Sequence, residues 1–79
     1  MGLTKREKEW GDRASRFVKA ELKRAGVGYK ELADRLNKHG MEETETSITG
    51  KLARGTFAAS FLLACLVALE LDGIRLEDL

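Results

Sequence analysis

The residues whose types and spacing are suited to chemistry gather between positions 44 and 54. If Ile48 and Leu52 face inward on a helix there, the polar positions between them face outward. Threonine, serine and lysine side chains can hydrogen-bond to DNA base edges or phosphates, and a glutamate can accept a hydrogen bond from the amino group of cytosine. The candidate binding residues of this segment are Thr44, Glu45, Thr46, Ser47, Thr49, Gly50, Lys51 and Arg54.

Catalytic and metal-binding chemistry has little support in the sequence. One cysteine and one histidine cannot form a disulfide, a zinc site or a histidine-based dyad. Cys65 lies in an apolar run with no base beside it, which is typical of a core thiol. We therefore expect a protein that is not an enzyme and that holds no cofactor and no metal.

No segment has the pattern of a signal peptide, and the only strongly apolar run, residues 57–69, is too short to span a bilayer. The sequence therefore predicts a cytoplasmic protein without a membrane segment.

Four helices must position the candidate residues. The 79 residues suffice for one domain, expected at 10–79, after a charged tail at 1–9 that we expect to be flexible. Apolar periodicity predicts helices at 8–25, 29–38, 45–54 and 58–71. Each predicted helix is followed by a glycine suited to ending it in a left-handed turn, namely Gly26, Gly40, Gly55 and Gly73.

The second and third predicted helices form the most informative unit. Each has only a small apolar face, so the other helices must cover this pair, leaving one face of 45–54 outward. That geometry is typical of a helix-turn-helix, whose second helix enters the major groove of DNA. Tyr29 opens the first of the two helices, where its hydroxyl can reach a phosphate; simple packing of its ring is an equally good interpretation.

Helical spacing also predicts the core residues and an excess of apolar surface on the last helix. The expected core residues are Phe17, Val18, Leu22, Leu32, Leu36, Ile48, Leu52, Phe61, Leu62, Cys65 and Leu69. The last helix is apolar all round, which is more surface than four helices can bury. We therefore expect a homodimer, or another protein partner, on an exposed patch that involves Leu63, Leu66 or Val67.

Charge is unevenly spread along the chain. Residues 1–40 carry 11 Lys and Arg against 6 Asp and Glu, or +5, whereas residues 41–79 carry 3 against 7, or −4. In the first predicted helix, Arg13, Arg16, Lys19 and Lys23 recur at helical steps. Such a stripe is either a solvated face or a surface for a DNA backbone.

Several segments together resemble a known family. Residues 26–36 with their Glu-Leu-Ala element, 47–55 with Ile followed by Arg-Gly, 68–71 and 75–79 are similar to the lambda-repressor-like (XRE-type) helix-turn-helix domains of phage and bacterial regulators. The whole chain also looks like a small uncharacterised bacterial domain family. The resemblance implies an all-α, compact bundle of four to five helices that regulates transcription. It also implies that Tyr29 and Lys30 contact phosphates, and that Glu45, Thr46, Ser47 and Gly50 contact base edges.

The sequence departs from that pattern at two points. About five extra residues, including Glu42 and Glu43, lie between the paired helices, and the tail after Gly73 is too short for a full fifth helix. Acids beside a recognition helix repel phosphate. Two hypotheses therefore stay open: a sequence-specific DNA-binding regulator contacting double-stranded DNA, or a protein-interaction module that keeps the fold without binding DNA.

Overall fold

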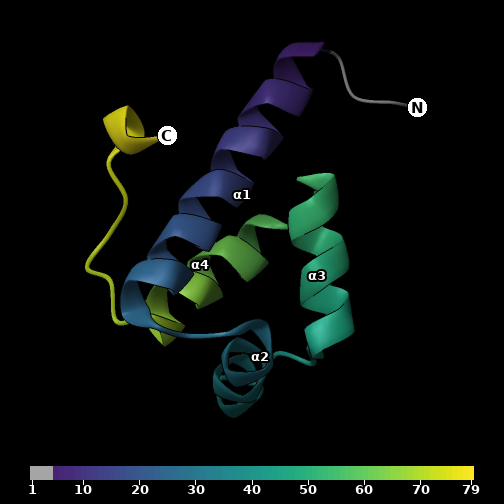
Figure 1. The fold of residues 1–79 in the computed structure, drawn as a ribbon, viewed down its shortest axis with the longest axis vertical. Coiled ribbons are helices and arrows are strands. Elements are labelled where there is room, and N and C mark those ends of the chain that lie inside the picture. The colour runs from purple at the N-terminus through teal and green to yellow at the C-terminus, as the bar shows by residue number, and fades with distance from the viewer. Residues whose placement is uncertain (1–4) are drawn as a thin grey trace.

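A computed structural model describes residues 5–79, in which four α-helices are followed by a short 3-10 turn. The helices are α1 (Lys5–Ala25), α2 (Tyr29–Lys38), α3 (Glu45–Arg54) and α4 (Ala59–Ala68), and the turn η1 is Leu76–Asp78. In Figure 1, α1 runs diagonally across the molecule, α3 stands to its right, α2 is seen end-on below, and α4 lies behind α1. The predicted all-α class is confirmed for residues 5–79, which contain no strand.

The core forms where the inner faces of all four helices meet. Nine of the eleven predicted core residues are buried, and the other two, Phe17 and Leu62, are half-buried and pack against them. The buried apolar residues are Val18, Leu22, Val27, Leu32, Ala33, Leu36, Ile48, Leu52, Phe61, Cys65, Leu66, Ala68 and Leu69. Ile48 and Leu52 are at most 1% exposed, so the inward face predicted for the third helix is confirmed.

The same hydrogen-bonded turn ends α1, α2 and α4. After α1, the amide of Val27 donates to the carbonyl of Leu22, and Gly26 has a φ of 71°. After α2, the amide of Met41 donates to Leu36, and Gly40 has a φ of 85°. This turn needs one residue in the left-handed conformation, which glycine adopts without steric cost.

The fourth predicted helix ends earlier than the sequence suggested. Glu70, with a φ of 59°, takes the left-handed position after α4, and the amide of Leu71 donates to Leu66. Gly73 therefore does not end a helix, and residues 69–71 lie outside α4. The prediction was wrong because it relied on glycine to end the helix, whereas a glutamate takes the left-handed conformation in this hydrogen-bonded turn at a cost of about 1 kcal/mol.

The start of α1 also differs from its prediction. The helix begins at Lys5 rather than at residue 8, so residues 5–9, expected as part of a flexible tail, are helical. Residues 1–4 of that tail lie outside the described residues. Trp10, which has the same three- and four-residue apolar spacing as the buried residues of this helix, is 55% exposed.

Two glycines bring α1 and α3 into backbone contact. A Cβ added to Gly11, in the middle of α1, would lie 2.2 Å from the carbonyl oxygen of Gly55. Gly55 is the left-handed C-cap of α3, with a φ of 68°. Because neither backbone can move away without displacing its helix, this contact fixes where the C-terminal end of α3 lies against α1.

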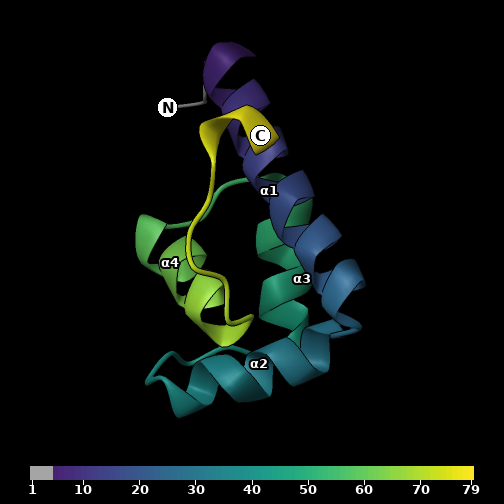
Figure 2. The same cartoon turned by 90° about the vertical axis from the view of Figure 1, so that its left-hand side faces the viewer.

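The tail after α4 turns back towards α1. Figure 2 shows it rising from the end of α4 to the N-terminal half of α1, where η1 lies.

Within residues 5–79 no single helix has the length and apolar composition to cross a bilayer. The helices α3 and α4 reach those criteria only when joined, and they are bent by 119° relative to each other.

Candidate nucleic-acid interface

The first turn of α3 is held by a closed set of hydrogen bonds. The Thr44 hydroxyl accepts from the amide of Ser47 at 3.1 Å, and the Ser47 hydroxyl accepts from the amide of Thr44 at 2.9 Å. This reciprocal capping satisfies two amide donors that would otherwise lack partners at a helix start. Both hydroxyls, predicted to contact DNA, are therefore engaged within the protein, although Thr44 itself remains exposed.

Glu43 lies beneath this turn as a buried carboxylate. Its side chain is 3% exposed; it accepts a hydrogen bond from the Ser47 hydroxyl at 2.7 Å and forms an ion pair with Lys51. The Glu43 amide donates to the side-chain oxygen of Asn37 at 2.9 Å, which ties the connection between α2 and α3 to the end of α2. The lysine ammonium also lies 4.8 Å from the centre of the Phe61 ring. Glu43 is thus a structural anchor and contributes no exposed negative charge.

Lys51 does not point outward as predicted. Its side chain is 29% exposed and is directed to Glu43 and Phe61 rather than away from the bundle. The prediction treated every polar residue outside the Ile48 and Leu52 face as solvent-facing. A long lysine side chain at the edge of that face can instead reach inward to a buried acid.

The outer surface of α3 is formed by the remaining candidates. Glu45, Thr46 and Thr49 are exposed, and the Thr49 hydroxyl donates to the carbonyl of Glu45 at 2.8 Å. Arg54 is exposed, and its guanidinium lies over Gly50, where an added Cβ would be 3.0 Å from Nη1. The surface therefore combines small side chains with one acid near its N-terminal end and one cation near its C-terminal end.

Basic residues of α1 flank this surface. Arg16 and Lys19 line a groove of about 300 Å³ between α1 and α3, which also includes Leu52 and Ala53. The remaining lining residues are Asp12, which forms an ion pair with Lys8, and Ser15. Neither Arg16 nor Lys19 has an ion-pair partner within residues 5–79, so both can pair with an external anion.

The basic stripe predicted along α1 is divided between two sides of that helix. The guanidinium of Arg13 lies 5.1 Å from the Trp10 ring. With Arg16 and Arg24, Arg13 lines a second groove, of about 550 Å³, which faces Asp78 of the C-terminal turn. Only Arg16 belongs to both grooves.

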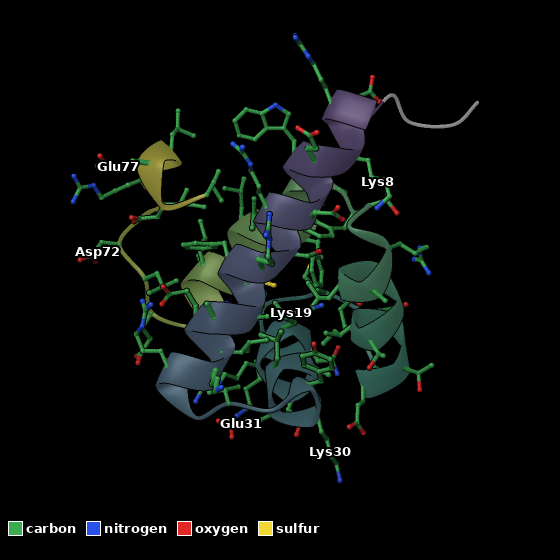
Figure 3. All side chains as sticks on the ribbon, turned by 45° about the horizontal axis from the view of Figure 1, so that its top comes forward. Lys8, Lys19, Lys30, Glu31, Asp72 and Glu77 are labelled. Atoms are coloured by element: carbon green, nitrogen blue, oxygen red, sulfur yellow. The ribbon has the colours of Figure 1, made fainter. Side chains whose placement is uncertain are left out.

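The start of α2 supplies one further exposed cation. Lys30 is exposed, and Figure 3 shows it projecting from the start of α2 away from the bundle, whereas Lys19 lies on the side of α1 that faces α3. Tyr29 is half-buried and packs against the core, which supports its packing interpretation without removing its hydroxyl from the surface.

Cys65 is inert in this arrangement. Burial raises the pKa of its thiol from 9.0 to about 12, with the Glu43 carboxylate adding to the rise and the Lys51 ammonium opposing it. Since the thiolate is the reactive form of cysteine, the thiol is a poor nucleophile at neutral pH.

Glu43 is the residue whose position differs most from the sequence prediction. The segment Met41-Glu42-Glu43 looked like an acidic insertion, but the structure separates the two glutamates into one exposed and one buried side chain. The signal that could have separated them is the four-residue spacing of Glu43, Ser47 and Lys51, which puts an acid just before the helix start within reach of a serine and a lysine inside the helix.

Taken together, the geometry defines a small all-α domain with a capped third helix, an uncovered outer face on that helix and basic residues at its flank. Residues 10–74 match a family described as a domain of unknown function, DUF6471, and the chain belongs to that family. This agrees with the small uncharacterised family expected from the sequence. No curated protein and no solved structure is detectably similar to the chain.

Proposed function

We propose that this domain binds double-stranded DNA through the outer face of α3, as a helix-turn-helix transcriptional regulator of the lambda-repressor type acting in the cytoplasm. The observation that carries the proposal is the groove between α1 and α3, where Arg16 and Lys19 lie beside Ala53 of α3. Cations that flank an uncovered helix can neutralise phosphates while that helix meets the bases.

The internal pairing of Glu43 supports this proposal. An exposed carboxylate at this point would repel phosphate, but its charge is neutralised by Lys51 inside the domain. The acids that remain exposed near the start of α3 are Glu42 and Glu45. The pair removes one acid and one cation from this face, so the net charge is unchanged, but the Glu43 carboxylate is kept away from an approaching phosphate.

In the proposed complex the exposed side chains either contact phosphates or contact bases. Lys30, Arg16, Lys19 and Arg54 contact phosphates and set the orientation of the domain. Thr46 contacts base edges through its hydroxyl. Thr49, whose hydroxyl is already bonded to the Glu45 carbonyl, presents its methyl group, which suits contact with the methyl of thymine. No catalytic role is part of the proposal, since the only thiol is buried and protonated.

A competition experiment with labelled duplexes of different sequence tests the assigned roles. Lys30→Ala should weaken binding to every duplex by a similar factor, because a phosphate contact is independent of sequence. Thr46→Ala should instead change the ratio of affinities between duplexes by about fivefold or more, since one base contact contributes about 1–3 kcal/mol of discrimination. Equal effects of both substitutions on all duplexes would remove the assignment of Thr46 to base recognition.

Neutralising the exposed acids tests whether this face approaches DNA at all. The double variant Glu42→Gln and Glu45→Gln should strengthen binding to mixed-sequence DNA at low salt, because it removes repulsion from phosphates. The matched control is Asp72→Asn with Glu77→Gln in the tail, which removes the same charge away from α3 and should have a smaller effect. If the first double variant still binds no duplex at low salt, the DNA proposal fails.

A second candidate function is favoured by the surface of α4. Leu63 is 60% exposed and Val67 is 58% exposed, as expected for a protein-interaction surface. Leu66, the third residue named for this patch, is only 8% exposed and belongs to the core. A domain that binds proteins through α4 would keep this surface whether or not α3 meets DNA.

A further inference from the structure

The exposed side of α4 is a single apolar stripe. Ala59, Leu63 and Val67 follow one another at four-residue steps and are all exposed, whereas Phe61 and Cys65 on the other side of the helix are buried. The tail does not cover the stripe: Leu63 and Val67 remain more than half exposed, and Leu76 of η1 is itself 78% exposed. Apolar side chains arranged in this way are typical of a contact surface.

Charges of both signs lie beside the C-terminal end of the stripe. Val67 lines a groove of about 390 Å³ with Lys38 and His39 from the end of α2, and with Glu70, which follows α4. The neighbouring Arg35 is occupied, because its guanidinium donates to the carbonyl of Ala68 at 2.9 Å and pairs with Glu31 at 2.6 Å. Lys38 and Glu70 have no ion-pair partner within residues 5–79.

We propose that this surface binds a second copy of the chain in a two-fold symmetric dimer. In such a dimer each surface meets its own copy, so it must be complementary to itself. An exposed apolar stripe beside one unpaired cation and one unpaired anion meets this requirement. Across the two-fold axis, the proposed dimer pairs Val67 with the partner's Val67, and Lys38 with the partner's Glu70.

The proposed dimer leaves the outer face of α3 free. Figure 2 shows α4 and α3 on different sides of the bundle, with α2 below both. The inference does not depend on DNA binding, and it is tested in the absence of DNA. The exposed apolar residues alone do not identify a partner for α4, whereas the charges beside them identify a second copy of the chain and the side chains that pair.

Sedimentation of the full chain tests the apolar centre. The average mass should rise from 8.8 kDa towards twice that value with increasing protein concentration, up to about 1 mM, because a surface this small gives a weak dimer. Val67→Asp should weaken self-association at least about tenfold. Leu76→Asp is the matched control: it puts the same charge on another exposed leucine and should leave the association unchanged. A wild-type chain that stays monomeric throughout, or a dimer insensitive to Val67→Asp, overturns the proposal.

Charge reversal tests the two-fold pairing. Lys38→Glu places like charges opposite each other in the dimer, and so does Glu70→Lys, so each variant alone should self-associate at least about fivefold more weakly. An equimolar mixture of the two variants restores both charge pairs and should form a mixed dimer about as readily as the wild type. Failure of the mixture to associate better than either variant alone contradicts the arrangement. Circular dichroism of each variant separates these effects from loss of folding.

Discussion

The carboxylate of Glu43 and the ammonium of Lys51 form an ion pair beneath the first turns of α3, and this pair joins the α2–α3 connection to that helix. The same carboxylate accepts a hydrogen bond from Ser47, whose hydroxyl also belongs to the helix cap. One acid thus anchors both the start of α3 and a lysine two turns along it. In the proposed complex with DNA, a helix start held by these bonds would lose little conformational entropy on binding.

Replacing Lys51 should destabilise the domain more than replacing Glu43. Lys51→Met leaves a carboxylate that is 3% exposed without its counter-charge, and should lower the free energy of unfolding by about 3–5 kcal/mol. Glu43→Gln should cost less, about 2 kcal/mol, because Lys51 can turn to water. Urea unfolding measures both values. The exposed Glu42→Gln is the control and should stay within about 0.5 kcal/mol of the wild type; equal effects at positions 42 and 43 would contradict the buried anchor.

Two glycines inside helices should respond to alanine with opposite signs. Gly11→Ala places a Cβ 2.2 Å from the carbonyl oxygen of Gly55, so α1 and α3 must separate, at a cost of about 2 kcal/mol or more. Gly50→Ala meets only the end of the flexible Arg54 side chain and should gain up to about 1 kcal/mol from helix propensity. Thermal unfolding of the two variants checks the difference. A Gly11→Ala variant as stable as the wild type would disprove the close contact of the two backbones.

Ser15 carries a buried hydroxyl without a hydrogen-bond partner in residues 5–79. Ser15→Ala should raise the free energy of unfolding by about 1 kcal/mol, because it removes an unsatisfied polar atom and improves helix propensity. Ser60→Ala on the exposed side of α4 serves as the control, with an effect within about 0.5 kcal/mol. Destabilisation by Ser15→Ala would mean that its hydroxyl is bonded in solution.

Cys65 should make the domain less stable at high pH. Burial holds the folded thiol neutral up to a pKa of about 12, whereas the unfolded thiol ionises around 9.0. Between these values the unfolded state binds fewer protons than the folded state, so stability falls as pH rises above about 9, by at most about 1.4 kcal/mol per pH unit. Denaturant midpoints of the wild type and Cys65→Val, compared from about pH 8 to pH 11, isolate this component. Parallel pH profiles of the two proteins would contradict the raised pKa.

The fold was predictable where local signals agree with packing. The bounds of α2 and α3 match the prediction at both ends, because Gly28 and Thr44 start these helices and Gly40 and Gly55 follow them. The end of α4 was not predictable in the same way, because a glutamate takes the left-handed position there. Helical spacing also does not predict the exposure of Trp10, because it does not tell how far along α1 the partner helices extend.

The candidate site was predictable as a segment but not as a set of side chains. Hydropathy separates Ile48 and Leu52 from the polar positions of α3. It cannot show that Ser47 and Lys51 are drawn inward by Glu43, because that depends on where the α2–α3 connection crosses the helix. The α1 cations were visible as a stripe, but only the packing of α1 on α3 determines that Lys19 flanks α3 while Arg13 lies against Trp10.

The most direct test of DNA binding is a salt titration with a mixed-sequence duplex, followed by fluorescence anisotropy. The wild type should lose affinity linearly in a plot of log K against log salt, with a slope of about −0.9 for each neutralised phosphate. The double variant Arg16→Ala and Lys19→Ala should reduce the magnitude of that slope by about 1–2, while Arg75→Ala, which removes a charge from the tail, should leave it unchanged. No detectable binding by the wild type at low salt, or a slope that depends on Arg75 as much as on Arg16 and Lys19, would contradict recognition of DNA by this face.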